Sequence, residues 1–224
     1  MNLEKEFLII VPARKGSQRI KGKNSKKING KPLYYWTLKE LKKIKDKIDI
    51  VITTDDSSII SNAKKMKFHV PFKRPKNLST DKSKIIDTIK YLLKYYEKKN
   101  IFYKNIILLQ VTSPLRTEKD ITESIKIYKK TKADTLISVF NIFGIYKKET
   151  FFEERNNNLF KKNIKANYVM NGPSILISSS KNIFKNKLYG KKIRYYEMPF
   201  EKSFDINNQY EFDICEKLLK SKSN

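Results

Sequence analysis

Residues 7–24, FLIIVPARKGSQRIKGKN, join a short apolar run to a loop rich in glycine and positive charge. The run at 7–11 is apolar without interruption and stops at Pro12, which is typical of a strand buried on both faces. The loop carries Gly16, Gly22 and several lysines and arginines, so its backbone N–H groups and cations suit a phosphate. The stretch predicts a buried strand that leads directly into an anion-binding loop.

The rest of the chain continues as alternating strands and helices. Apolar runs predict strands at 48–54, 106–111, 134–140, 174–177 and 193–198. Helical spacing predicts helices at 33–44, from the cap candidates at 55–57 to residue 66, at 84–96, at 117–128 and at 208–219. Continuous apolar strands need cover on both faces, so the sequence predicts a single α/β domain with a mostly parallel, doubly wound sheet.

One segment breaks this rhythm. Residues 141–168 have no clear period and contain a run of three asparagines, so no secondary structure is assigned to them. We expect an irregular excursion there, either a dimerisation arm or a flap.

Composition excludes several classes of protein. The chain has 224 residues with 39% hydrophobic residues, which favours a folded domain over a disordered one. Cys215 is the only cysteine and His69 the only histidine, which excludes an internal disulfide and a structural zinc cluster. No apolar stretch approaches the length of a membrane span, and no signal peptide pattern is present, so a cytoplasmic protein is expected.

The net charge of +26 raises the question of nucleic-acid binding. Only six of the 49 basic residues are arginines, and the lysines are spread through nearly every segment. Nucleic-acid binders gather cations on one face and interleave aromatic residues, so a diffuse lysine excess favours a solvated surface. A non-catalytic polyanion binder remains the alternative from another class.

Two common phosphate-binding patterns do not fit the first loop. Gly16 and Gly22 enclose five residues instead of the four of the Walker A motif, and Lys23 is followed by Asn24. The dinucleotide-binding glycine pattern is absent too. Further polar motifs, TTDD at 53–56 and QVTSPLR at 110–116, follow other predicted strands, where ligands bind in parallel sheets.

Several spaced motifs occur in one order along nearly the whole chain. They are PARKGSQRIKGKN at 12–24, NGKPL at 29–33, TTDD at 53–56, RPKNLSTD at 74–81, LLQVTSPLR at 108–116, NG at 171–172 and SFDIN at 203–207. This set resembles the acylneuraminate cytidylyltransferases, also called CMP-sialic acid synthetases, with the CMP-Kdo synthetases as more distant relatives. The resemblance implies a nucleotide-diphospho-sugar transferase-like fold.

The resemblance also implies a reaction and a set of site residues. The α-phosphate of CTP would be attacked by the anomeric hydroxyl of a nonulosonic acid, with Mg²⁺ as cofactor, in a homodimer. The implied roles are catalysis for Arg14 and Lys23, nucleotide binding for Arg14, Ser17, Lys23, Asn24 and Arg74, sugar binding for Gln110 and Asn171, and metal binding for Asp205 and Asn207.

The chain departs from the family pattern in two places. The family usually has D-x-D where this chain has Asp205, Ile206 and Asn207, so weaker or water-mediated metal binding is expected. No R-Q pair precedes the NG motif, which leaves the acceptor and the dimer mode open. Kdo, or another sugar with a different nucleotide, remains an alternative acceptor.

Each candidate also has a purely structural interpretation. Asp56 could cap a helix, and Asp205 with Ser203 could cap the last one. Arg74 and Arg116 could hold loops by donating to carbonyl groups. Gln110 could be a polar side chain satisfied inside the sheet.

Overall fold

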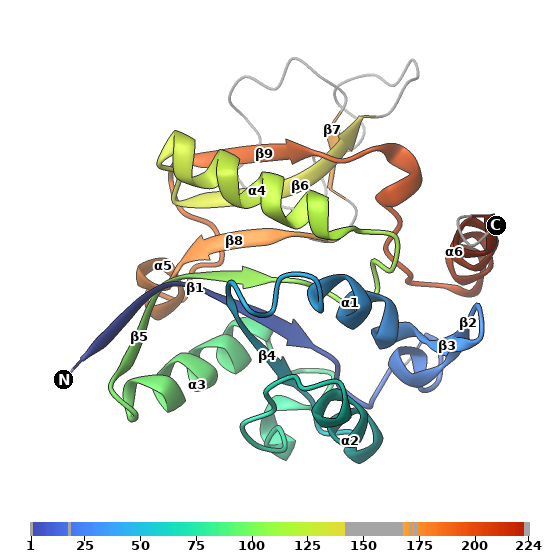
Figure 1. Ribbon diagram of the computed structural model, residues 1–224, viewed down its shortest axis with the longest axis horizontal. Helices are drawn as coiled ribbons and strands as arrows, with labels where there is room; N and C mark the ends of the chain where they lie inside the picture. Colours follow the sequence, from blue (N-terminus) through green and yellow to red (C-terminus); the bar gives the residue numbers. More distant parts are fainter. Residues whose placement is uncertain (1, 18, 142–167, 171, 173, 222–224) are drawn as a thin grey trace.

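The computed structural model describes residues 2–17, 19–141, 168–170, 172 and 174–221. The main-sheet strands there are β1 (Leu3–Pro12), β4 (Asp49–Thr53), β5 (Ile101–Leu108), β6 (Thr135–Asn141), β7 (Tyr168–Val169), β8 (Leu176–Ser179) and β9 (Ile193–Glu197). They form one sheet in the order β4-β1-β5-β8-β6-β7, and β9 pairs with β6 (Figure 1). A two-stranded hairpin of β2 (Lys27–Ile28) and β3 (Lys31–Pro32) lies apart from it.

Most of the sheet runs in one direction. β1 is parallel to β4 and β5, and β6 is parallel to β9. Since β8 is antiparallel to both β5 and β6, these five strands all point the same way, and β8 and β7 are reversed. The prediction of a mostly parallel sheet is confirmed for the part of the chain that the structure describes.

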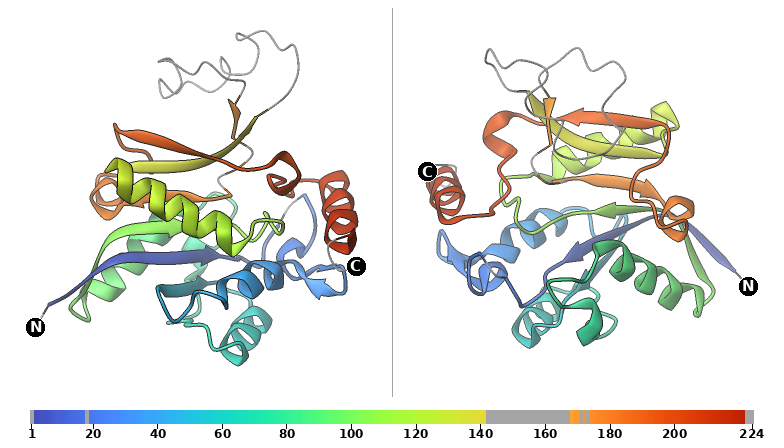
Figure 2. Two further views of the ribbon diagram at one scale, coloured as in Figure 1. Left: turned by 45° about the horizontal axis from the view of Figure 1, so that its top comes forward. Right: turned by 180° about the vertical axis from the view of Figure 1, so that it is seen from behind.

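Helices cover both faces of the sheet. The α-helices are α1 (Leu33–Leu41), α2 (Ser57–Lys65), α3 (Ile85–Glu97), α4 (Glu118–Thr131), α5 (Ser180–Phe184) and α6 (Gln209–Ser221). The short 3-10 turns are η1 (Lys23–Ser25), η2 (Lys76–Leu78) and η3 (Phe200–Lys202). α1, α2 and α4 share a core on one face, and α3 and α5 share the core on the other (Figure 2). This is the predicted doubly wound arrangement.

The apolar run of β1 explains why two cores are needed. Successive strand side chains point to opposite faces. Phe7, Ile9 and Val11 therefore enter the core beneath α1, α2 and α4, whereas Leu8 and Ile10 enter the core beneath α3. A third apolar cluster packs α6, including the buried thiol of Cys215, against Ile28 and Ile206. In the described residues, no helix combines the length and apolar character that a membrane span requires.

The capping predictions were partly right. Asp56 caps α2 by accepting hydrogen bonds from the backbone N–H groups of Ser58 and Ile59. Thr117 and Asp120 form a reciprocal capping box at the start of α4. The expected cap of α6 is different, because Asn208 accepts from the backbone of Glu211 while Glu211 accepts from the backbone of Asn208.

Arg116 is a buried cation that ties three elements together. Its Nη1 donates to the carbonyl oxygens of Gln110 at 3.1 Å and Ser174 at 2.5 Å, and its Nη2 donates to Thr37 Oγ1 at 3.0 Å. Burial lowers the pKa of Arg116 to about 10, so the guanidinium stays charged at neutral pH. The arginine therefore holds the segment after β5 against the segment before β8 and against α1.

We expect Arg116→Met to lower the free energy of unfolding by about 2 to 4 kcal/mol, because it leaves buried carbonyl groups without donors. The matched control is Arg194→Met, since Arg194 is exposed and its guanidinium donates to the carbonyl of its own neighbour, Ile193. That change should stay within about 0.5 kcal/mol. Urea unfolding of both variants measures the difference, and equal losses would contradict the role given to Arg116.

Candidate active site

A cleft of about 550 Å³ lies where the chain leaves the carboxyl ends of β1 and β5. This is the edge at which parallel sheets bind ligands. Its lining contains these residues that the sequence singled out: Arg14, Ser17, Lys23, Asn24, Arg74, Gln110, Asp205 and Asn207. The structure therefore brings together residues that are up to nearly two hundred positions apart in the chain. Asn171, the remaining candidate, lies outside the described residues.

The first loop is held in shape by polar contacts of its backbone. Asp55 Oδ1 accepts from the N–H of Lys15 at 2.7 Å, and Asn24 Nδ2 donates to the carbonyl oxygen of Arg14 at 2.7 Å. The side chain of Arg14 forms an ion pair with Asp81. The amide nitrogen of Asn24 thus supports the loop, and its side chain still borders the cleft.

Lys23 links this loop to the segment that carries Asp205. Its Nζ donates to the carbonyl oxygen of Ile206 at 2.5 Å. Burial lowers the pKa of Lys23, and the nearby carboxylate of Asp205 partly opposes that effect. A half-buried ammonium group with a neutral carbonyl as partner is well placed to neutralise an incoming anion.

Asp205 is a buried carboxylate with one free oxygen. Its side chain is 6% exposed, and Oδ2 accepts from Asn207 Nδ2 at 3.0 Å. Oδ1 is buried and has no hydrogen-bond partner in the described residues. Because Asn208 and Glu211 cap α6, Asp205 is not the cap that its sequence position also allowed.

Gly172 makes room for Asp205. It has a φ of +52°, and a Cβ placed on it would lie 2.5 Å from Asp205 Oδ2. The NG motif therefore does more than form a turn, since its glycine allows the backbone to pass directly against the carboxylate.

Arg74 has a structural role inside the cleft. Its side chain is 5% exposed, its Nε donates to Thr53 Oγ1 at 3.1 Å, and its Nη2 bonds the Thr53 carbonyl oxygen. Burial lowers the pKa of Arg74 to about 10, so it remains a cation at neutral pH. Arg74 thus bonds a carbonyl, as one interpretation of the sequence had it, and also borders the cleft.

Gln110 lines the cleft just beyond β5. Its side-chain contact to Thr112 Oγ1 is long, at 3.5 Å, while its backbone carbonyl is bonded to Arg116. The lining also contains apolar and aromatic residues that sequence reasoning missed, among them Leu176, Leu188 and Tyr189. None of these three residues belongs to a charged or polar motif, so no signal in the sequence could have identified them as cleft residues.

The donor set fits a cation that also binds substrate oxygens. Among the described residues, no three or more His, Cys, Asp or Glu side chains gather into a metal cluster. Mg²⁺ commonly binds one or two carboxylates together with phosphate oxygens and water. The unpartnered Oδ1 of Asp205, at the edge of a cationic cleft, meets that requirement.

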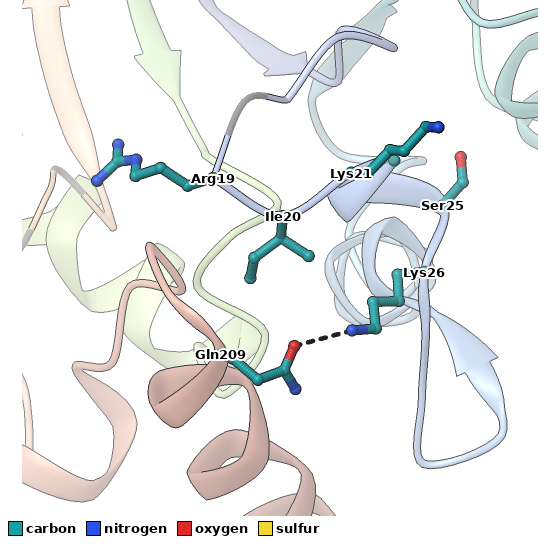
Figure 3. Close-up of a pocket in the computed structure, with 7 residues that line it drawn as sticks. Arg19, Ile20, Lys21, Ser25, Lys26 and Gln209 are labelled. Atoms are coloured by element: carbon teal, nitrogen blue, oxygen red, sulfur yellow. Dashed lines mark hydrogen bonds between the residues drawn. The ribbon is translucent and has the colours of Figure 1, made fainter.

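A second cavity of about 610 Å³ adjoins the first loop and includes Arg19, Lys21, Lys26 and Gln209 in its lining. Figure 3 shows that Lys26 reaches Gln209, at 2.9 Å, whereas Arg19 and Lys21 point away from that pair. Because these cations diverge, this cavity does not gather charge around one point. The larger set of converging polar groups belongs to the first cleft.

Comparison with known proteins identifies the family. The model of the cytidylyltransferase family matches residues 8–222. The chain belongs to the cytidylyltransferase family, and it is a nucleotidyltransferase. The resemblance seen in the sequence motifs is therefore confirmed.

Individual relatives agree with this assignment. The chain is 30% identical to the CMP-N,N'-diacetyllegionaminic acid synthase of Legionella pneumophila over 95% of its own length and 96% of that protein. It is 25% identical to the N-acylneuraminate cytidylyltransferase of Escherichia coli over 94% of its own length and 51% of that protein.

The fold of this cytidylyltransferase also matches a solved structure. A CMP:2-keto-3-deoxy-manno-octonic acid synthetase complexed with CTP superposes with a TM-score of 0.69, covering 97% of this chain and 100% of that one at 14% identity. At this low identity the likeness shows the fold alone.

We expect Gly172→Ala to lower the free energy of unfolding by about 2 to 3 kcal/mol, because the methyl group adds a clash with Asp205 to the cost of a positive φ. Gly30→Ala is the control, since Gly30 has a φ of +74° but nothing within 4 Å of an added Cβ. It should lose only about 1 to 2 kcal/mol. If urea unfolding gave the two variants equal losses, the close approach of Gly172 to Asp205 would be refuted.

Proposed function

We propose that this cytidylyltransferase transfers CMP from CTP to the anomeric hydroxyl of a sialic-acid-like nonulosonic acid and releases pyrophosphate, with Mg²⁺ as cofactor. The observation that carries the proposal is the convergence of Arg14, Lys23 and Asp205 on one cleft. The similarity to a legionaminic acid synthase along almost the whole chain supports the class of acceptor.

The proposed transfer forms one bond and breaks another at the α-phosphorus. The anomeric oxygen bonds to that phosphorus, the bond to the bridging oxygen of the β-phosphate breaks, and the hydroxyl proton passes to solvent. Such a reaction needs alignment and charge neutralisation more than covalent help from the protein. A site without histidine is therefore sufficient.

Each side chain then has a task. Arg14 and Lys23 bind the triphosphate and offset the negative charge that develops on the departing pyrophosphate. Ser17, Asn24 and Arg74 contact the nucleotide. Gln110 and Asn171 contact the acceptor. Asp205 is the proposed protein ligand of Mg²⁺, which would supply further neutralisation of the phosphate oxygens.

The proposal includes a homodimer and a cytoplasmic location. Phe200 is the proposed contact of the second chain: it is 56% exposed and lies edge-on against Phe140, which is buried, and Phe204, which is partly buried. Light scattering of the purified chain tests the dimer.

The test of the function is pyrophosphate release from each of the four nucleoside triphosphates, with Mg²⁺, against a panel of nonulosonic acids, Kdo and neutral sugars. We expect release with CTP and a nonulosonic acid, and its loss when the metal is chelated. Release with Kdo or a neutral sugar alone would replace the proposed acceptor. No release with any pair, together with salt-sensitive binding of long nucleic acid, would favour a polyanion binder.

Lys23 should contribute far more to kcat/KM for CTP than Lys21, which lies two positions away in the same loop. We expect Lys23→Ala to lower kcat/KM for CTP by about 10² to 10³, because a preorganised cation at the phosphates is lost. Lys21→Ala removes the same charge from the same loop, but Lys21 is exposed, is not part of the cleft lining, and points away from Lys26 and Gln209 (Figure 3). That control should change kcat/KM by less than about threefold. Similar losses of kcat/KM in both variants would mean that Lys23 contributes only its positive charge to the loop and makes no specific contact with the phosphates.

A further inference from the structure

Asn207 contacts Asp205 through its amide nitrogen. Nδ2 lies 3.0 Å from the backbone carbonyl oxygen of Asp205 and 3.0 Å from Asp205 Oδ2. Both neighbours are hydrogen-bond acceptors, so the atom facing them must be the nitrogen and not the amide oxygen. In this arrangement one oxygen of the carboxylate is occupied by a neutral donor.

The backbone around this contact is fixed by bonds to three other elements. Ile206 N donates to the Thr112 carbonyl at 2.8 Å, and the Ile206 carbonyl accepts from Lys23. Glu211 Oε2 accepts from the N–H groups of Asn207 at 2.5 Å and Asn208 at 3.0 Å. The loop at 205–208 is therefore supported by protein groups from several parts of the chain.

The other carboxylate oxygen is left without a protein partner. Oδ2 is confined between the amide of Asn207 and the backbone of Gly172, where not even a methyl group would fit. Oδ1 is buried and unpartnered in the described residues, and Asp205 borders the cleft. A buried carboxylate oxygen without a donor is costly unless a ligand satisfies it.

We propose that Asn207 is a positioning residue that holds Asp205 Oδ2 and thereby presents Oδ1 to a divalent cation. The inference rests on the proposed function for the identity of the cation. Asn207 acts through Asp205 in this scheme, because its Nδ2 bonds Asp205 Oδ2. A carboxylate at position 207 would remove the donor and place two carboxylates about 3 Å apart, and their repulsion would be relieved by a cation or by a shared proton.

The first experiment compares Asn207→Asp with the unaltered protein by thermal unfolding, without metal and with saturating Mg²⁺. We expect Tm of the unaltered protein to rise on adding Mg²⁺, because a cation that binds only the folded state stabilises it, but to rise by less than Tm of Asn207→Asp. Tm of Asn207→Asp should be about 4 to 8 °C lower without metal and should recover much of that loss with Mg²⁺. The control is Asn2→Asp, which adds the same charge at an exposed position, and it should follow the unaltered protein.

The second experiment measures Mn²⁺ binding by electron paramagnetic resonance, in the presence of CTP and without any acceptor sugar. Asn207→Ala keeps Asp205 but removes the donor that orients it. We expect Mn²⁺ to bind this variant about tenfold more weakly or worse, as is typical when a partner of a metal ligand is lost. The Mn²⁺ measurement on Asn207→Ala can be made even if Asn207→Asp does not fold.

The outcomes separate this inference from the proposed function. Unchanged Mn²⁺ affinity in Asn207→Ala, or a Tm of Asn207→Asp that responds to Mg²⁺ no more than that of the unaltered protein, would overturn the role of Asn207. Failure of the proposed function would instead appear as absent pyrophosphate release from the unaltered protein with every CTP and sugar pair. The metal titrations do not depend on turnover, so each result can be obtained without the other.

Discussion

The buried guanidinium of Arg116 is the contact on which the arrangement of the cleft depends. It donates to the carbonyl oxygens of Gln110 and Ser174 and to the hydroxyl of Thr37. Because β8 is reversed, its first residues lie at the same edge of the sheet as the last residues of β5. Nη1 of the guanidinium joins both, and Nη2 of the same planar group reaches Thr37 at the same time. Gln110 lines the cleft directly, and Gly172 passes against Asp205, which lines it too.

The parts of the fold that depend on local pattern could be predicted from the sequence. The run at 7–11 is apolar on both faces, and the structure covers both faces of β1 with helices. The reversal of β8 could not be predicted, because direction depends on which strands become neighbours and not on the residues of the strand itself. The hairpin of β2 and β3 and the five-residue helix α5 were also missed, since two to five residues are too few to show a period.

The candidate site also has a part that could be predicted from the sequence and a part that could not. The cationic loop and the motif order predicted that Arg14, Lys23 and Asp205 would meet, and they line one cleft. The partners of these groups were not predictable, because they come from contacts made only in the folded chain. Asn24 supports the backbone of Arg14, Arg74 bonds Thr53, and the pairing of Arg14 with Asp81 spans two loops. Residue types indicated the chemistry, and the fold decided which atoms remain available for it.

Arg14, Lys23 and Asp205 each have a hydrogen-bond or ion-pair partner in the folded chain. A charged ligand can replace or add to each of these contacts at a small cost in free energy. The ion pair of Arg14 with Asp81 is substantially exposed, with side chains 33% and 44% accessible, and such pairs contribute only about 0 to 1 kcal/mol. Lys23 is held by a neutral carbonyl, which is a weaker partner for an ammonium group than a phosphate oxygen. Asp205 is held by a neutral amide on one oxygen only. Lys23 and Asp205 are therefore positioned without a counter-charge in direct contact, and the exposed pair of Arg14 with Asp81 is weak enough for a phosphate to compete with it. This explains how a site with few strong ion pairs can still be well ordered.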